Sequence, residues 1–194
     1  MTRTTLLACL LLGSGAAAFA QTTANTVQRD INQQQRIEQG LQSGALNMRE
    51  ASSLEREESR VNQLQTQALK DGKMTPAEQT KLNAAQNKVS SDIFAAKHNS
   101  VTGNPQSASS QRMQADVQRN INQQQRVENG VQNGSLTNRE VAKLEHGQSK
   151  VAKAEASAGH DGHVTANEQA HVQRAENHQS KHIYNQKHDA QQKN

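Results

Sequence analysis

The chain has 194 residues and a formal net charge of +4, from 22 Lys and Arg residues against 18 Asp and Glu residues. Basic and acidic residues are interspersed, Trp is absent and aromatic residues make up 2% of the chain, so the dense basic patch and the stacking platforms of nucleic-acid-binding proteins are missing. The apolar side chains are few and mostly small, which predicts a thin core and modest stability.

Residues 1–20 have the pattern of a secretory signal peptide. Arg3 supplies a positive start, an apolar stretch runs from Leu6 to Leu12, and Ala18-Phe19-Ala20 forms a cleavage site. Leu6-Leu7-Ala8-Cys9 is similar to a lipoprotein attachment site, but Cys9 comes too early to have a full apolar region before it. Because Cys9 is the only cysteine, the exported chain would have neither disulfides nor thiolate metal sites. We expect a periplasmic or secreted protein with no membrane span.

Residues 27–98 and 117–188 are two copies of one unit, aligned without a gap at an offset of 90, and roughly 32 of the 72 paired positions are identical. The motif Arg29-x-Ile31-Asn32-Gln33-Gln34-Gln35-Arg36 recurs at Arg119 to Arg126. Self-similarity of this kind defines the structural unit. We expect a first repeat at 21–99, a linker rich in Gly, Pro and Ser at 100–115, a second repeat at 116–190 and a tail at 191–194.

Apolar residues recur three and four positions apart within each repeat, which is the spacing of an amphipathic helix with one narrow apolar face. In chain order, the first repeat predicts helices around Val27 to Leu41, Leu54 to Ala68 and Leu82 to Ile93. The second repeat keeps the pattern, except that Gln179 replaces Val89 and weakens the apolar face of its third helix. We therefore predict an all-α fold of two tandem three-helix units, built from helical hairpins and joined by a flexible linker.

A short turn motif occurs twice in each repeat. It is exemplified by Gly72-Lys73-Met74-Thr75-Pro76-Ala77-Glu78. The glycine is expected to end one helix in the left-handed conformation, and the Asn or Thr to cap the next helix, with the Glu completing a capping box. The four glycines of these turns are Gly44, Gly72, Gly134 and Gly162.

Two of these turns also resemble the second half of an EF-hand calcium loop. Asp71-Gly72 through Glu78, and Asp161-Gly162 through Glu168, place Gly, an apolar residue and Glu at the loop spacing of that family. The resemblance implies weak calcium or manganese ligation by Asp71, Glu78, Asp161 and Glu168. The first two ligand positions depart from the family, because they hold Gln67 and Leu69 in one turn and Ser157 and Gly159 in the other. Too few oxygens remain for calcium, so helix capping is the favoured interpretation.

The chain as a whole resembles a group of uncharacterised exported bacterial helical tandem-repeat proteins. The shared features are Asn-Gln-Gln-x-Arg-Ile-x-x-Gly units, the degenerate EF-hand-like turn and a closing Ile-Tyr-x-x-Lys-His, here Ile183 to His188. The resemblance covers almost the whole mature chain and implies no established activity.

Six histidines occur in the second repeat where the first repeat has none: His146, His160, His163, His171, His178 and His182. His178 and His182 are four residues apart and share a helix face, which His171 also joins. The turn at Gly162 folds the second helix back on the third and sets His146 opposite about residue 177 or 178. Imidazoles in this arrangement suit zinc, copper or nickel. His160 and His163 flank the turn and would form a separate, weaker pair.

Two other interpretations of these histidines remain open. Four of them replace lysines, one replaces Arg56 and one replaces Asp92, as expected for drift among solvated positions. The cluster would also suit a pH sensor. His98 and His188 are different, because both repeats keep a Lys-His pair there, which favours a structural role at a helix end.

No catalytic constellation is present, so we expect no enzyme, and we expect the many Glu residues on capped turns and exposed helix faces. The first functional hypothesis is a divalent metal-binding protein that buffers, scavenges or delivers zinc, copper or nickel, with manganese or calcium as secondary candidates. The alternative is a non-catalytic interaction or chaperone module that binds an envelope protein partner. That alternative is motivated by the repeated Arg-x-Ile-Asn-Gln-Gln-Gln-Arg segment, because Gln and Asn suit wet helix–helix contacts.

Overall fold

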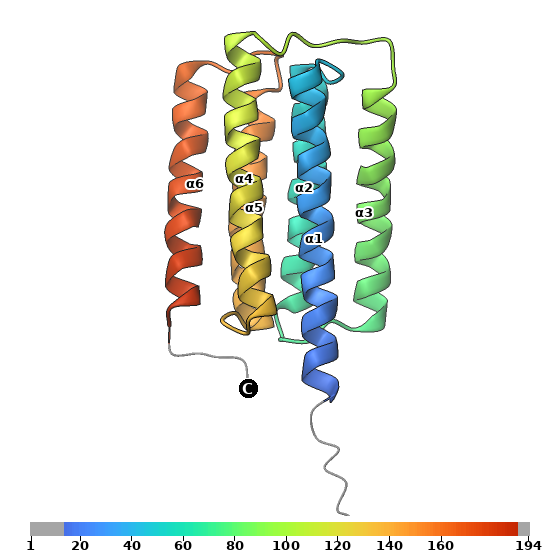
Figure 1. The fold of residues 1–194 in the computed structure, drawn as a ribbon, viewed down its shortest axis with the longest axis vertical. Coiled ribbons are helices and arrows are strands. Elements are labelled where there is room, and N and C mark those ends of the chain that lie inside the picture. The colour runs from blue at the N-terminus through green and yellow to red at the C-terminus, as the bar shows by residue number, and fades with distance from the viewer. Residues whose placement is uncertain (1–13, 190–194) are drawn as a thin grey trace, which may run out of the picture.

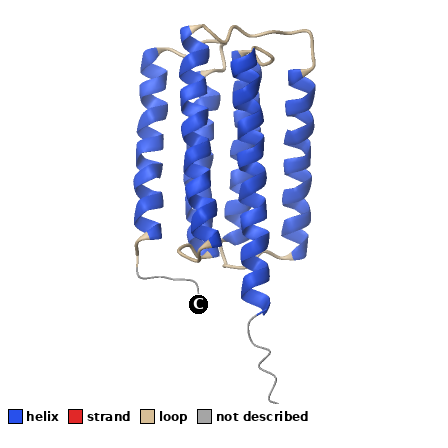
Figure 2. Cartoon of the chain, in the orientation of Figure 1, coloured by secondary structure: helices blue, strands red, loops and turns tan. Residues whose placement is uncertain are grey.

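The computed structural model describes residues 14–189, and all the regular structure in that range is helical. The helices run up and down in chain order (Figures 1 and 2). They are α1 (Ser14–Ser43), α2 (Met48–Leu69), α3 (Pro76–Lys97), α4 (Ala108–Gln132), α5 (Asn138–Ala158) and α6 (Ala166–Lys187). The predicted all-α fold is confirmed. Residues 1–13 of the predicted signal peptide and the predicted tail at 191–194 lie outside the described residues.

The two repeats pack against each other and share one hydrophobic core. Helix α2 packs along α5 and α1 along α4, while α3 and α6 lie on the outer flanks (Figure 1). Ser59 donates a hydrogen bond to the carbonyl of its repeat counterpart Ser149 at 2.9 Å, and Ser52 donates to the carbonyl of Ala156 at 2.5 Å. These pairs show that α2 and α5 are antiparallel and that a pseudo-two-fold axis passes near Ser59 and Ser149. The arrangement as two units on a flexible linker is therefore not confirmed.

Small residues explain why this interface is hard to read in the sequence. Ala51, Ser52 and Ser59 on α2 are buried, as are Ser149 and Ala152 on α5. Short side chains let two helix backbones approach closely, so ridges of one helix fit the grooves of the other. Because serine does not register as apolar, the second buried face of α2 and α5 is absent from the apolar spacing pattern.

The segment between the repeats is shorter than predicted and packs against the first repeat. Helix α4 begins at Ala108, inside the predicted linker, with Ser107 as its N-cap. The Gly103 N–H donates to the carbonyl of Gly44 at 2.8 Å. A Cβ added at Gly103 would lie 2.3 Å from the Leu46 carbonyl oxygen. Glycine is needed there because two stretches of backbone approach each other closely.

The four repeated turns have the predicted geometry. The φ angles are 74° at Gly44, 91° at Gly72, 78° at Gly134 and 95° at Gly162. Helices α2, α3, α5 and α6 each begin with a complete capping box in which the Asn or Thr and the Glu satisfy each other's backbone N–H groups. The capping interpretation of the motif is confirmed.

The repeated Gln and Arg segment holds each repeat together from inside. Gln33 Nε2 donates to the Gln86 carbonyl at 2.6 Å and to Ser90 Oγ at 2.9 Å, and Arg36 donates to the Ser90 carbonyl at 3.1 Å. Equivalent bonds join Gln123 and Arg126 to α6 in the second repeat. The segment thus ties α1 to α3 and α4 to α6.

Several acidic residues lie in the core, contrary to the expectation that they occupy capped turns and exposed faces. Asp30, Glu55, Glu58, Glu145 and Glu155 are almost completely buried. That expectation is wrong because amides of neighbouring helices supply hydrogen bonds inside the bundle, which offset part of the burial cost. Their donors include Gln34 for Glu55 at 2.9 Å, Gln124 for Glu145 at 3.2 Å, Asn120 for Glu155 at 3.2 Å and Gln86 for Asp30 at 2.6 Å.

Burial raises the pKa of these carboxyl groups far above the usual range. It raises the pKa of Asp30 and of Glu55 to about 7, and that of Glu145 to about 8. The pKa of Glu58 is raised well above its ordinary value by burial, and further by nearby acidic groups including Asp30, Glu55 and Glu145. Neither carboxyl oxygen of Glu58 has a hydrogen-bond partner among the described residues. A neutral, protonated core therefore fits the structure best.

Candidate functional site

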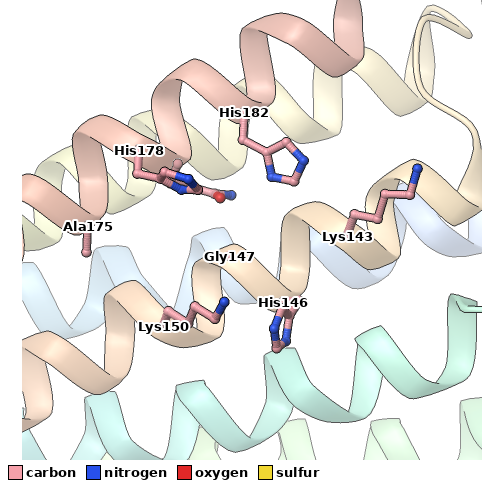
Figure 3. A pocket seen from close by; sticks show the side chains of 8 residues that line it. Lys143, His146, Gly147, Lys150, Ala175, His178 and His182 are labelled. Carbon is pink, nitrogen blue, oxygen red and sulfur yellow. The ribbon is translucent and has the colours of Figure 1, made fainter.

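A hollow of about 280 Å³ lies between α5 and α6 of the second repeat. Three of the predicted histidines line it: His146 on α5, and His178 and His182 on α6 (Figure 3). The fold-back at the Gly162 turn thus places His146 across from His178, as the sequence predicts. The other lining residues are Lys143, Gly147, Lys150, Ala175 and Gln179.

The first repeat carries a network of charged residues at the equivalent positions. Lys88 on α3 forms ion pairs with Glu57 on α2, at 3.4 Å from Nζ to Oε1, and with Asp92 one turn along α3. The second repeat holds Gly147, His178 and His182 at these three positions. The two repeats therefore provide an internal comparison, in which an ion-pair network is replaced by two imidazoles beside a glycine.

Gly147 and Gln179 fit each other and form one wall of the hollow. A Cβ added at Gly147 would lie 1.8 Å from Gln179 Oε1, so this glycine makes room for the glutamine. Gln179 is buried, and its Nε2 donates to the Leu144 carbonyl at 2.9 Å. The substitution that weakens the apolar face of α6 is therefore accommodated by a hydrogen bond to α5.

His178 and His182 are the closest pair of imidazoles at the hollow. Their ring centroids are 6.4 Å apart and the ring planes are inclined by 52°. Partial burial lowers the pKa of His182, and the positive charges of His178, Lys143 and Lys150 lower it further. The lowered pKa favours the neutral form of this imidazole, which is the form that binds metal ions.

His146 lines the same hollow but does not point at the other two rings. In Figure 3 its ring lies on the side of α5 away from α6, toward α2. The side chain is exposed, so it is free to change rotamer.

The remaining three predicted histidines lie elsewhere. His171 lines a separate hollow beside Glu168, although the helical spacing predicts a face shared with His178. His160 is exposed, and its Nδ1 lies 3.0 Å from the Ser157 carbonyl. His163 lies beside Asp161 and Arg49 in a third hollow, where the Gly162 turn meets α2. The structure thus places three of the six histidines at this hollow and the other three outside it.

The acidic residues of the EF-hand-like turns are used in local structure. Glu78 Oε2 accepts hydrogen bonds from Thr75 N at 2.9 Å and Thr75 Oγ1 at 2.7 Å, and Glu168 does the same with Thr165. These bonds lower the pKa of both glutamates. The other two acidic residues also bond within their own turns. Asp71 accepts a hydrogen bond from Lys73 N, and Asp161 accepts one from His163 N.

His98 and His188 have the structural role predicted for them. They are the C-cap residues of α3 and α6. Each Nδ1 lies 2.7 Å from the carbonyl of the residue four positions earlier, Phe94 or Tyr184, and each imidazole stacks on that residue's ring at 4.1 Å. The same device therefore ends the last helix of both repeats.

The sequence reasoning missed the two lysines of the hollow, Lys143 and Lys150. The histidines are one part of a broader difference between the repeats. Glu57 and Asp92 have no acidic counterpart in the second repeat, and Lys143 replaces Ser53. A comparison of every position on the two helix faces would reveal that change of charge.

Among residues 14–189, no three His, Cys, Asp or Glu side chains are placed so as to hold a metal ion together. No helix in the same range has both the length and the apolar character of a membrane span. Comparison of the chain with protein-family models, curated proteins and solved structures found no match.

Proposed function

We propose that the protein binds a divalent transition metal ion in the hollow between α5 and α6, through His178 and His182. The observation that carries this proposal is the placement of two imidazoles on adjacent turns, 6.4 Å apart, where the first repeat has Lys88 and Asp92. The ion-pair partners of Lys88 in the first repeat, Glu57 and Asp92, are both absent at the equivalent positions, Gly147 and His182.

The donor atoms decide which metals are expected. Imidazole nitrogen suits zinc, copper and nickel, whereas calcium and manganese prefer oxygen ligands. No carboxylate lines the hollow. A third nitrogen becomes available if His146 rotates toward α6. Together with the predicted export signal, these donors point to buffering, scavenging or delivery of metal in the periplasm or outside the cell.

The alternative of an interaction module has less support. Its basis is the repeated Gln and Arg segment, whose side chains are bonded to α3 and α6 of the same chain.

Calorimetric titration at pH 7 with zinc, copper and nickel tests the proposal. We expect the His178→Ala, His182→Ala double variant to weaken binding of the preferred metal by a factor of ten or more, or about 1.4 kcal/mol. The matched control is His160→Ala, His171→Ala, which removes two exposed imidazoles outside the hollow and should leave the affinity unchanged. Equal affinities in both variants and the unaltered protein would contradict the assignment.

A further inference from the structure

The hollow between α5 and α6 is lined by positive charges, which disfavour a metal ion bound without an anion. Lys143 and Lys150 lie on α5 on either side of Gly147, across from His178 and His182 (Figure 3). Both ammonium groups are close enough to lower the pKa of His182. A divalent cation bound there would add two positive charges beside two existing ones, with no acidic side chain among the lining residues.

Comparison with the first repeat shows that this charge is specific to the second. The equivalent face of the first repeat contains two carboxylates, Glu57 and Asp92, which form ion pairs with Lys88. Both carboxylates are absent from the second repeat, and Lys143 stands where the first repeat has Ser53. The face has therefore lost both of its own anions, while the gain of Lys143 offsets the replacement of Lys88 by His178.

The coordination of the metal leaves room for an external anion. Two imidazoles fill only half of the positions around a four-coordinate ion, and the open positions take water or a bound ligand. The hollow measures about 280 Å³, several times the roughly 30 Å³ that one water occupies in the liquid. A small organic or inorganic anion of several heavy atoms fits that volume.

We propose that the hollow takes up the metal ion together with a small oxyanion, a carboxylate or a phosphate. The oxyanion fills the open positions on the metal and pairs with the ammonium groups of Lys143 and Lys150. This inference rests on the proposed metal binding. It changes the cargo from a bare ion to a metal–anion complex and gives the two lysines a role in selecting it.

The test is calorimetric titration of the full chain at pH 7 with malonate, a dicarboxylate, in the absence and presence of saturating zinc. We expect malonate to bind at least tenfold more tightly to the zinc-loaded protein. A parallel titration with inorganic phosphate distinguishes the two kinds of oxyanion, and tighter binding of either one by the zinc-loaded protein supports the proposal.

The Lys143→Gln, Lys150→Gln variant should lose this gain without any loss of affinity for zinc alone, because removal of two positive charges does not disfavour a cation. The matched control, Lys153→Gln, Lys181→Gln, removes exposed charges of the same two helices that do not line the hollow. The inference is overturned if zinc binds but neither oxyanion binds more tightly with it, or if both lysine variants lose the gain equally. Failure of zinc itself to bind would instead overturn the proposed function, and with it the basis of the inference.

Discussion

Raising the pH from about 5 to about 8 is expected to lower the free energy of unfolding by several kcal/mol. Burial is the main cause of the raised pKa of Asp30, Glu55, Glu58, Glu145 and Glu155 in the folded protein. The same groups ionise near pH 4 in an unfolded chain. Between these limits the folded protein binds more protons than the unfolded chain, so stability is fully present below about pH 4 and is lost as the pH rises through 7 to 8.

The magnitude of the effect follows from the number of groups. One unit of pKa shift corresponds to about 1.4 kcal/mol, so a single unit in each of the five groups amounts to about 7 kcal/mol. The whole stability of an ordinary domain is about 5–15 kcal/mol. The capping glutamates Glu78 and Glu168 change stability with pH in the opposite sense. Their pKa is lowered in the folded protein, so they stabilise the caps when ionised and lose this contribution only when they are protonated in acid, below about pH 4.

Hydrogen bonding points to protonation of the core independently of these values. The buried side-chain oxygens without partners include Asn62 Oδ1, Gln65 Oε1 and Gln148 Oε1, which are acceptors. Ionised carboxylates add further acceptors, whereas a protonated carboxyl group donates one hydrogen bond. Proton uptake on folding would therefore supply donors that the core lacks.

Urea unfolding followed by circular dichroism at pH 5, 6, 7 and 8 measures this dependence. The variant Glu58→Gln is informative because the second repeat already has Gln148 at the equivalent position. We expect it to raise the free energy of unfolding at pH 8 by about 1–3 kcal/mol, with little effect at pH 5. The exposed Asp71→Asn serves as the control and should leave the pH dependence unchanged. A free energy of unfolding that stays constant or rises from pH 5 to pH 8 would refute the account of the core.

The second large effect is expected from Leu144→Ala in α5. Leu144 is completely buried in the core that both repeats share. Removal of its side chain should cost about 2–5 kcal/mol, because a cavity adds to the lost burial. Since α5 packs along α2, the substitution should destabilise both repeats.

Hydrogen exchange of the backbone amides separates a shared core from two independent units. We expect Leu144→Ala to reduce protection in α2 as well as in α5, in a single cooperative unfolding transition. The control is Val101→Ala, where the side chain is about half exposed at 48%, and it should change stability by less than about 0.5 kcal/mol. Loss of protection confined to the second repeat would indicate that the repeats unfold separately.

The helices and turns are predictable from the sequence because their signals are local. Apolar spacing and the four Gly-to-Glu turns locate the helices, but the observed helices extend beyond the predicted spans, and α1 begins at Ser14 rather than near Val27. The packing of one repeat on the other is not predictable in this way. It depends on Ser52, Ser59 and Ser149, and on the buried Glu and Gln side chains, which single-residue hydropathy assigns to solvent.

The candidate site is predictable in part for the same reason. The four-residue spacing of His178 and His182, and the fold-back that places His146 across from them, follow from helix geometry. The rest depends on rotamers and on pairs of positions. The direction of the His146 ring, the fit of Gln179 against Gly147 and the approach of Lys143 and Lys150 all require the packed structure.

The most direct test of metal binding by this hollow is an imidazole ¹H–¹⁵N spectrum of the protein at pH 7, recorded as zinc is added to one equivalent. The account predicts that the signals of His178 and His182 change first, that His146 follows or joins them, and that His98, His160, His163, His171 and His188 stay in place. Equal changes at all the histidines, or none at His178 and His182, would contradict it.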